Sequence, residues 1–201
     1  LLVGHEIEAL TKLVDGPKRP FVGVLGGAKV SDKINIVDAL ARRCDTLIIG
    51  GAMAYTFLKA KGVEVGSSRV ENGKINHAKR VLERCESRGV TVLLPVDHIV
   101  AEELSPTAEC EVVSEIADGK MGLDIGPETI ASFAEVLNEA GTIFWNGPMG
   151  VFEMDAFSAG TQGVAKAVAA SKAYSVVGGG DSAAATSKFE LTDDMSHIST
   201  G

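Results

Sequence analysis

The sequence of 201 residues has few cysteines and no long hydrophobic run. Cys44, Cys85 and Cys110 are odd in number, widely spaced and without a C-x-x-C pair, which argues against a disulfide framework and a zinc site. No apolar run approaches the roughly 18 residues of a membrane-spanning helix, and the N-terminus lacks the features of a signal peptide. We therefore expect a soluble, cytoplasmic protein.

Basic residues are also scarce relative to acidic ones. The chain has 19 lysines and arginines against 27 acidic residues, for a formal net charge of -8. Grooves for nucleic acids and patches for membrane surfaces need a surplus of positive charge, so this balance argues against both kinds of partner. An anionic ligand must find its positive charge in a few particular residues.

Short apolar runs alternate with helical patterns along most of the chain. A hydrophobic content of 45% and a charged content of 23% suit a globular protein with a sizeable core. Continuous apolar runs are typical of strands buried on both faces, and their alternation with helices predicts a parallel sheet. The predicted strands are 21–25, 46–49, 91–95, 142–145 and 174–177, and the predicted helices are 31–43, 53–61, 73–88, 127–139 and 157–170, with an alanine-rich helix after 178–182.

The segment from Asp97 to Asp124 departs from this alternation. Glutamates and Pro106 surround short β-like stretches such as Cys110 to Val113, which predicts a small antiparallel excursion. No internal repeat, low-complexity tract or linker-like composition divides the chain. The expected fold class is therefore α/β, with a three-layer, doubly wound, Rossmann-like parallel sheet, helices on both faces, and one domain over residues 1–201.

Three of the predicted strands end in glycine-rich loops. Gly26-Gly27-Ala28-Lys29 follows the first strand, Gly50-Gly51-Ala52 the second, and Gly178-Gly179-Gly180-Asp181 the last. Ligands of parallel sheets bind outside the C-terminal ends of the strands, so these loops are expected to line one crevice. Glycines let backbone amides approach an anion closely, and helix starts add unpaired N–H groups and a positive dipole end.

Lys29 and Lys33 add positive charge to the first of these loops. At helical spacing they would share one face of the helix start, where like charges repel by roughly 0.2–0.5 kcal/mol. A bound anion would offset this repulsion, whereas an ordinary solvated helix start is the alternative. In the last loop Asp181 offers a carboxylate through which Mg²⁺ can bridge to phosphates, and a first-turn or N-cap acid is its alternative role.

Two other segments are candidate pocket walls. Asn146-Gly147-Pro148 ends a buried strand in a turn, where Val151 and Phe152 can flank a flat base and Glu153 can accept hydrogen bonds from ribose hydroxyls. Met121-Gly122-Leu123-Asp124 can bring backbone close to an adenine. The alternatives are a solvated glutamate and an ordinary tight turn.

The common fingerprints of nucleotide and hydrolytic sites are absent. Neither G-x-x-x-x-G-K-[ST] nor G-x-S-x-G occurs. The segment from Gly178 to Ala183 fits the relaxed G-x-G-x-x-A dinucleotide pattern, but we expect no room for the following strand before the chain stops at Ser199-Thr200-Gly201, and we expect a fragment. His98 beside Asp97 is expected to be a surface or capping histidine.

Seven segments resemble the phosphoglycerate kinase family and occur in the family's order. They are GGAKVSDK, GGAMAYTFL, LPVDH, MGLDIGPET, WNGPMGVFE, GGGDSAA and SHISTG. The resemblance spans nearly the whole chain and is to the C-terminal half of those enzymes, which binds ADP or ATP with magnesium. It implies that the N-terminal half, which binds 3-phosphoglycerate or 1,3-bisphosphoglycerate, and the extreme C-terminus are absent from this chain.

This resemblance implies a glycolytic phosphotransferase, expected to be a monomer, that moves a phosphoryl group reversibly between 1,3-bisphosphoglycerate and ADP. The acceptor is a carboxyl group. The chain alone is expected to bind nucleotide without turning it over, because half of the reacting pair has no site.

The resemblance also implies roles for individual residues. Lys29 would neutralise the phosphoryl group in flight, and Lys33 would hold the terminal phosphate. Gly179 and Gly180 would donate amides to the phosphates, which completes the expected catalytic set, and Asp181 would engage the magnesium ion. Asn146 and Glu153 would contact the ribose side, and Gly51, Ala52, Gly122, Leu123 and Val151 would lie around the adenine. The remaining implied nucleotide-binding residues are Gly27, Ala28 and Ser182.

Two positions depart from the family's pattern. Ala52 stands where many members have a third glycine, and Arg69 stands where many have leucine, so Arg69 either stacks on the base or points to solvent. Two other functions stay open, namely an NAD-binding oxidoreductase module and a catalytically silent interaction domain. Lys29 and Lys33 discriminate between the three, because a kinase needs both.

Overall fold

The computed structural model describes residues 11–200, and a parallel sheet forms its centre. Within these residues, six strands pair in the order β3-β2-β1-β7-β8-β9, and all of the pairs are parallel. The strands are Phe21–Leu25 (β1), Thr46–Ile49 (β2), Thr91–Leu93 (β3), Thr142–Asn146 (β7), Tyr174–Gly178 (β8) and His197–Ser199 (β9). The predicted parallel sheet is confirmed.

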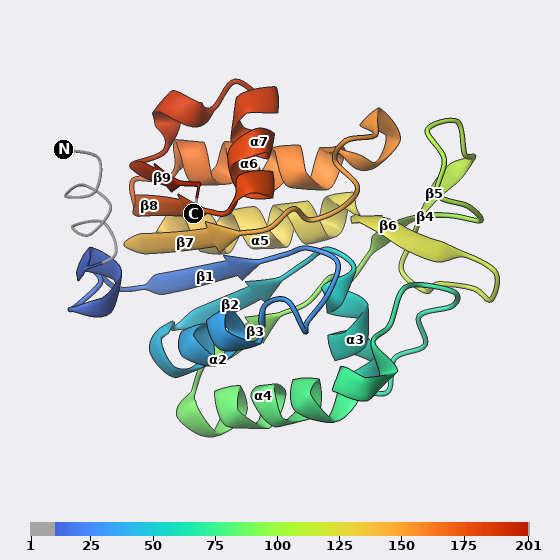
Figure 1. Cartoon of the computed structure of the whole chain (residues 1–201), viewed down its shortest axis with the longest axis horizontal. Helices are drawn as coiled ribbons and strands as arrows, with labels where there is room; N and C mark the ends of the chain where they lie inside the picture. Colours follow the sequence, from blue (N-terminus) through green and yellow to red (C-terminus); the bar gives the residue numbers. More distant parts are fainter. Residues whose placement is uncertain (1–10, 201) are drawn as a thin grey trace.

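Helices cover both faces of this sheet, which makes three layers (Figure 1). On one face lie α2 (Ile34–Arg43), α3 (Met53–Ala60) and α4 (Ile75–Arg88), preceded by the short 3-10 helix η1 (Asn72–Lys74). On the other face lie α5 (Pro127–Glu139), α6 (Ala159–Ala170) and α7 (Gly180–Lys188), with η2 (Asp155–Phe157) and η3 (Thr192–Asp194) beside them. The α/β class predicted from the alternation is therefore confirmed.

The two hydrophobic cores follow from the alternation of side chains along each strand. In β1, Phe21 and Leu25 pack with α2, α3 and α4, whereas Val22 and Val24 pack with Trp145 and with α5 and α6 on the opposite face. Successive side chains of a strand point to opposite faces, so a strand covered on both sides must be apolar throughout. All five residues of β1 are buried accordingly.

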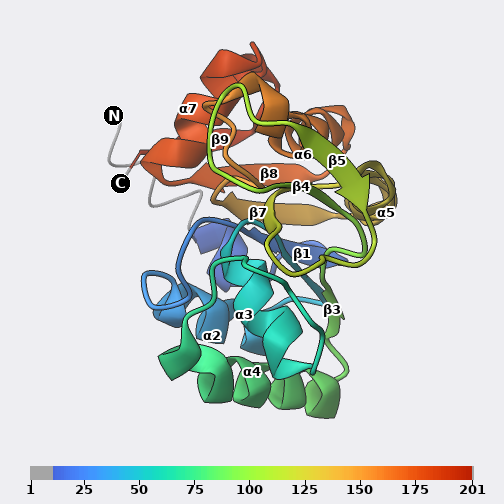
Figure 2. The same ribbon diagram turned by 90° about the vertical axis from the view of Figure 1, so that its right-hand side faces the viewer.

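A second, smaller sheet projects from the end of the molecule. Its strands, in the order β5-β4-β6, are Cys110–Val113, His98–Ala101 and Met121–Ile125, and both pairs are antiparallel. Figure 2 faces this end of the molecule, with β4 and β5 toward the viewer. Buried side chains of this sheet and of α3 form a third cluster, which includes Tyr55, Leu58 and Val100. The predicted antiparallel excursion is confirmed.

The bounds of the predicted elements agree with the structure to within two residues, except at the start of α2. This helix begins at Ile34 rather than at Ser31, because residues 31–33 form a turn in which the N–H of Lys33 donates to the carbonyl of Val30 at 2.9 Å. The amides of Val30 and Ser31 bond to the carboxylate of Glu71. The expectation that the chain leaves no room for another strand was also wrong. β9 is only three residues long and half-buried, so it carries no apolar run that a pattern can detect.

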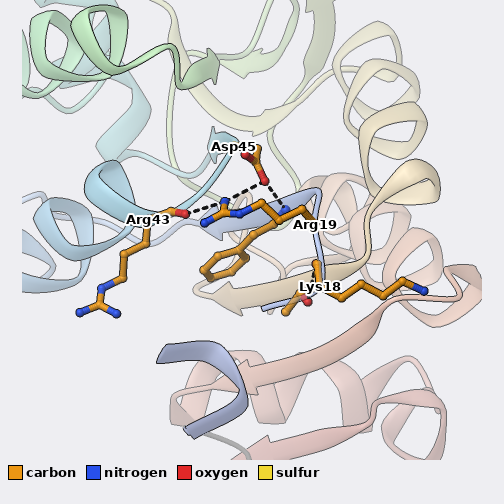
Figure 3. A network of polar contacts seen from close by, with 6 residues as sticks. Lys18, Arg19, Arg43 and Asp45 are labelled. Atoms are coloured by element: carbon orange, nitrogen blue, oxygen red, sulfur yellow. Dashed lines mark hydrogen bonds and ion pairs between the residues drawn. The ribbon is translucent and has the colours of Figure 1, made fainter. Parts of the chain in front are cut away.

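A polar network at the N-terminal ends of the central strands fixes where β1 and β2 begin (Figure 3). Arg19 Nη1 donates to the carbonyl of Arg43 and to Asp45 Oδ2, both at 3.0 Å. The same Asp45 oxygen accepts the N–H of Phe21 at 2.7 Å, and the Thr142 hydroxyl donates to the carbonyl of Lys18 at 2.7 Å. These contacts hold the first residues of three neighbouring strands together.

The helices and the cysteines bear on a membrane span and on disulfide bonds. Between residues 11 and 200, no helix is long and apolar enough to cross a membrane. All three cysteines are free, and Cys44 and Cys85 are buried, where burial and the neighbouring Cys85 thiol raise the pKa of Cys44 to about 12. Cys44 is therefore held as a neutral thiol in the core.

Candidate functional site

The glycine-rich loops after β1, β2 and β7 meet backbone to backbone at the C-terminal edge of the sheet. Gly27 N–H donates to the carbonyl of Pro148 at 3.0 Å, and Gly51 N–H donates to the carbonyl of Met149 at 3.1 Å. Gly51 has a φ of +68°, and a Cβ on it would lie 2.6 Å from the nitrogen of Gly27, so only glycine fits. Two of the three loops predicted to line one crevice therefore meet here, with the loop after β7 between them. The third, after β8, contributes Asp181 to the cavity lining.

A cavity of about 320 Å³ opens where these loops face β6 and the segment after β7. Nine of the residues predicted to bind a nucleotide line it: Gly27, Ala28, Gly51, Ala52, Gly122, Leu123, Val151, Glu153 and Asp181. Met121 and Asp124, which end the segment predicted to approach an adenine, also line it. Sequence reasoning missed other lining residues: Tyr55, Leu104, Met149 and Gly150. The sequence left open whether Arg69 stacks on the base or points to solvent. Its side chain is exposed and also lines the cavity.

Close backbone packing shapes the part of the cavity beside β6. Val151 N–H donates to the carbonyl of Leu123 at 3.0 Å, which joins the segment after β7 to β6. Gly122 N–H donates to the Ser68 hydroxyl at 2.9 Å, and a Cβ on Gly122 would lie 1.9 Å from the Tyr55 oxygen. A side chain at position 122 would therefore collide with Tyr55, so the wall at Gly122 consists of backbone.

Apart from Lys29, the other predicted residues lie at or beside the start of α7 rather than in the cavity wall. Lys33 Nζ donates to Asn146 Oδ1, and Asn146 Nδ2 donates to the carbonyl of Gly178 at 2.9 Å. Asn146 was expected on the ribose side, but it is buried next to Lys33 and is not part of the wall that holds Glu153. Burial lowers the pKa of Lys33 and outweighs the opposite effects of Asp181 and Asp32.

The start of α7 supplies backbone donors. Gly179, with a φ of +93°, precedes the helix, and Gly180 at its first position is exposed. The first N–H groups of a helix have no partner within it, and no side chain of the described residues caps α7. Ser182 is buried instead, and its hydroxyl accepts the N–H of Gly147 at 2.6 Å, so it braces the turn after β7.

Lys29 and Lys33 do not share a helix face, contrary to the prediction. Both precede α2, since Lys33 is the residue before its first turn. Lys29 is exposed in the loop after β1, two residues beyond the wall residue Gly27. The two ammonium groups are therefore placed by the loop and not by helical periodicity.

Comparison with known proteins decides which family this arrangement belongs to. The sequence model of the family described as "Phosphoglycerate kinase" matches residues 1–201. The chain belongs to the phosphoglycerate kinase family. The resemblance found in seven segments is thereby confirmed over the whole chain.

Relatives in the phosphoglycerate kinase family are similar throughout this chain but are about twice as long. The chain is 53% identical to the phosphoglycerate kinase of Bdellovibrio bacteriovorus and 55% identical to that of Anaeromyxobacter dehalogenans, with all of this chain and 50% and 51% of the relatives covered. The solved phosphoglycerate kinase of Coxiella burnetii superimposes with a TM-score of 0.97 at 47% identity, over 99% of this chain and 52% of that one. That of Pyrococcus horikoshii gives 0.86 at 36% identity, over all of this chain and 51% of that one.

The burial of Asp124 in the cavity lining is the main feature that sequence reasoning missed in this chain of the phosphoglycerate kinase family. Asp124 is 2% exposed, and its carboxylate accepts the N–H of Gly160 at 2.8 Å and that of Ile125 at 2.9 Å. Burial raises its pKa to about 7, because these two hydrogen bonds only partly compensate the lost hydration. An aspartate within the otherwise apolar run Met121–Ile125 was the available signal.

His98 was expected to be a surface or capping histidine, but it is buried, and its neighbour Asp97 caps a helix instead. Its Nδ1 lies 3.1 Å from the Tyr55 hydroxyl, and burial lowers its pKa although Asp97 acts in the opposite direction. Asp97 holds the start of α5, because its carboxylate accepts the N–H groups of Glu128 at 2.9 Å and Thr129 at 2.8 Å. The small sheet folds over α3, and this contact between distant segments covers the imidazole.

Proposed function

We propose that this chain is the nucleotide-binding half of a phosphoglycerate kinase and that its cavity binds ADP or ATP with Mg²⁺. The observation that carries the proposal is the position of Asp181, which both lines the apolar cavity and lies in the first turn of α7. A flat base in the cavity would thereby have its phosphates directed toward a helix start. Helix starts bind phosphates through unpaired N–H groups and the positive end of the dipole.

The proposed contacts follow from where the side chains lie. The base would stack between the wall at Gly122 and Leu123 and the segment that carries Val151, and the exposed carboxylate of Glu153 would accept hydrogen bonds from ribose hydroxyls. The amides of Gly179 and Gly180 and the ammonium group of Lys33 would hold the phosphates. For Asn146 the bond to Lys33 supports a role in orienting that side chain rather than a ribose contact.

Asp181 fits a magnesium ion that is shared with a nucleotide. Among residues 11–200 no group of three or more His, Cys, Asp or Glu side chains is placed to hold a metal by itself. Magnesium commonly takes one or two carboxylates together with substrate phosphates, and Asp181 is an exposed carboxylate at the phosphate end. When bound, the ion would neutralise phosphate charge, while Asp181 would hold it next to the start of α7.

Phosphoryl transfer asks the protein mainly for positioning and for positive charge near the transferred group. No general base is needed, because the acceptor in the proposed reaction is a carboxylate. Lys29, whose side chain is exposed, is proposed to meet the phosphoryl group between 1,3-bisphosphoglycerate and ADP. The site for phosphoglycerate would lie in the half of the relatives that this chain does not match, so we propose that the chain alone binds nucleotide without turnover.

The alternatives are weaker. β9 supplies the next strand that an NAD-binding module requires, but Ser199 and Thr200 stand at its end where such modules carry an acidic residue. A silent interaction domain would not need a bare wall at Gly122 or a lysine held at a helix start. The cytoplasmic location and the monomeric state expected from the sequence stay predictions.

Calorimetric titration of the chain tests the proposal, with ADP and ATP in the presence and absence of Mg²⁺ and NAD as the control ligand. We expect ADP to bind and NAD not to bind. Lys33→Ala should weaken ATP binding about tenfold or more, and AMP binding much less, because the lost contact is to the terminal phosphate. Absence of ADP binding would refute the proposal. Phosphoryl transfer from 1,3-bisphosphoglycerate to ADP by this chain alone would refute the expected lack of turnover.

A further inference from the structure

Glu71 lies between α3 and α4, outside the cavity wall, and its carboxylate reaches across to the loop after β1. One oxygen, Oε2, accepts the N–H of Val30 at 2.5 Å and that of Ser31 at 3.2 Å. The other, Oε1, accepts the hydroxyl of Ser31 at 2.5 Å. Both oxygens of one carboxylate are therefore used to hold two consecutive residues of a loop about 40 positions away in the sequence.

Glu71 is itself fixed to the scaffold. Its backbone N–H donates to the hydroxyl of Thr56 at 3.1 Å, and Thr56 is 1% exposed within α3. The same helix begins at Met53, whose N–H donates to the carbonyl of Gly27 at 3.0 Å. The loop after β1 is thus tied to α3 at two points, directly at Gly27 and through Glu71 at Val30 and Ser31.

Lys29 lies between these two points of attachment. Its own side chain is exposed, so the position of its ammonium group depends on the path of the backbone on either side. The electrostatics agree with a firm attachment of that backbone: burial acts to raise the pKa of Glu71, but the hydrogen bonds from Ser31 and Val30 and the charge of Lys29 outweigh it and leave the pKa below its ordinary value. Glu71 is therefore held as a carboxylate.

We propose that Glu71 is a positioning residue for phosphate binding, which sets the path of the Gly27–Ser31 loop and so places Lys29 toward the phosphates of the nucleotide. The inference rests on the proposed function. If Glu71 acted only through its charge, it would weaken the binding of an anion, because it places a negative charge close to Lys29. Positioning and charge competition therefore predict opposite effects when Glu71 is neutralised.

The test compares Glu71→Gln with the matched control Glu64→Gln, both in the chain of 201 residues. Glu64 lies in the same connection, and its exposed carboxylate pairs only at the surface with Lys59 at 3.3 Å, so the control removes the same charge without touching the loop. ADP, ATP and adenosine are titrated with Mg²⁺. Glu71→Gln should weaken ATP binding about tenfold, the loss expected when charge-assisted contacts are replaced by weaker ones, and leave adenosine binding within about twofold. Glu64→Gln should bind all three like the wild type.

A second variant and a second measurement keep the inference testable if Glu71→Gln is poorly folded. Ser31→Ala removes only the hydroxyl contact to Oε1 and should weaken ATP binding about threefold. Amide hydrogen exchange without nucleotide should be faster at Val30 and Ser31 in Glu71→Gln and unchanged in Glu64→Gln.

Each result separates the inference from the proposed function. ATP binding that is unchanged or tighter in Glu71→Gln, with a wild type that binds ADP, overturns the positioning role alone. An equal loss for ATP and adenosine also overturns it, because a general distortion of the cavity would not distinguish the phosphates. A wild-type chain that binds no ADP overturns the proposed function and this inference with it.

Discussion

The burial of Asp124 should make the protein less stable as the pH rises from about 4 to about 7. Its folded-state pKa of about 7 lies above the ordinary value of 3.8, so the folded protein holds this proton over a range in which the unfolded chain has lost it. Stability falls with pH wherever the folded state binds more protons. At about 1.4 kcal/mol per unit, the full interval corresponds to a loss of about 4 kcal/mol in the free energy of unfolding.

His98 acts in the opposite direction and must be separated from Asp124. Its pKa is lowered in the folded state, so the unfolded chain takes up a proton first when the pH falls below about 6.5, and this lowers stability at acidic pH. Asp124→Asn removes only the aspartate. The amide keeps one carbonyl acceptor for the N–H of Gly160 or Ile125, and loses the second, so the variant starts with a cost of about 1 kcal/mol.

The assay is urea unfolding of the wild type and Asp124→Asn at pH 5 and pH 8, with the free energies compared at each pH. We expect the variant to be less stable than the wild type at pH 5 and to gain about 3 kcal/mol relative to it by pH 8, because the wild type alone must ionise a buried carboxyl group above pH 5. His98 is present in both proteins and cancels. A difference between variant and wild type that stays constant within about 0.5 kcal/mol would refute the reasoning, since Asp124 would then ionise equally in the folded and unfolded states.

Two other substitutions test the cavity and the scaffold separately. Gly122→Ala puts a methyl group against the Tyr55 side chain, so it should cost about 1–3 kcal/mol in stability and also weaken ADP binding. Chemical denaturation measures the first effect and calorimetry the second. Unchanged ADP binding would contradict the proposed wall. Asp45→Ala leaves the N–H of Phe21 without its acceptor and should cost about 1–3 kcal/mol in denaturation, while ADP affinity stays that of the wild type because the network lies at the other edge of the sheet.

Much of the site was predictable because its chemistry resides in local backbone. Glycines after apolar runs predict loops at the C-terminal edge of a parallel sheet, and topology alone brings such loops together. Nine predicted residues line the cavity for this reason. For Asn146 the sequence predicted a position at the end of a buried strand, but not the neighbours of its side chain. The amide that was expected to face a ribose bonds to Lys33, 113 residues away in the sequence.

What the sequence alone determined was the class of fold, the glycine-rich edge and the family, since apolar periodicity, turn chemistry and short motifs are local properties. Tertiary structure decided where α2 begins, because residues 31–33 close into a turn through the bond from the N–H of Lys33 to the carbonyl of Val30, while Glu71, from a distant part of the chain, holds the amides of Val30 and Ser31. It also decided that His98 and Asp124 are buried, because the small sheet folds over α3 and packs beside α6. Ionisation and helix ends depend on groups that meet only in the folded chain, and no local pattern records those meetings.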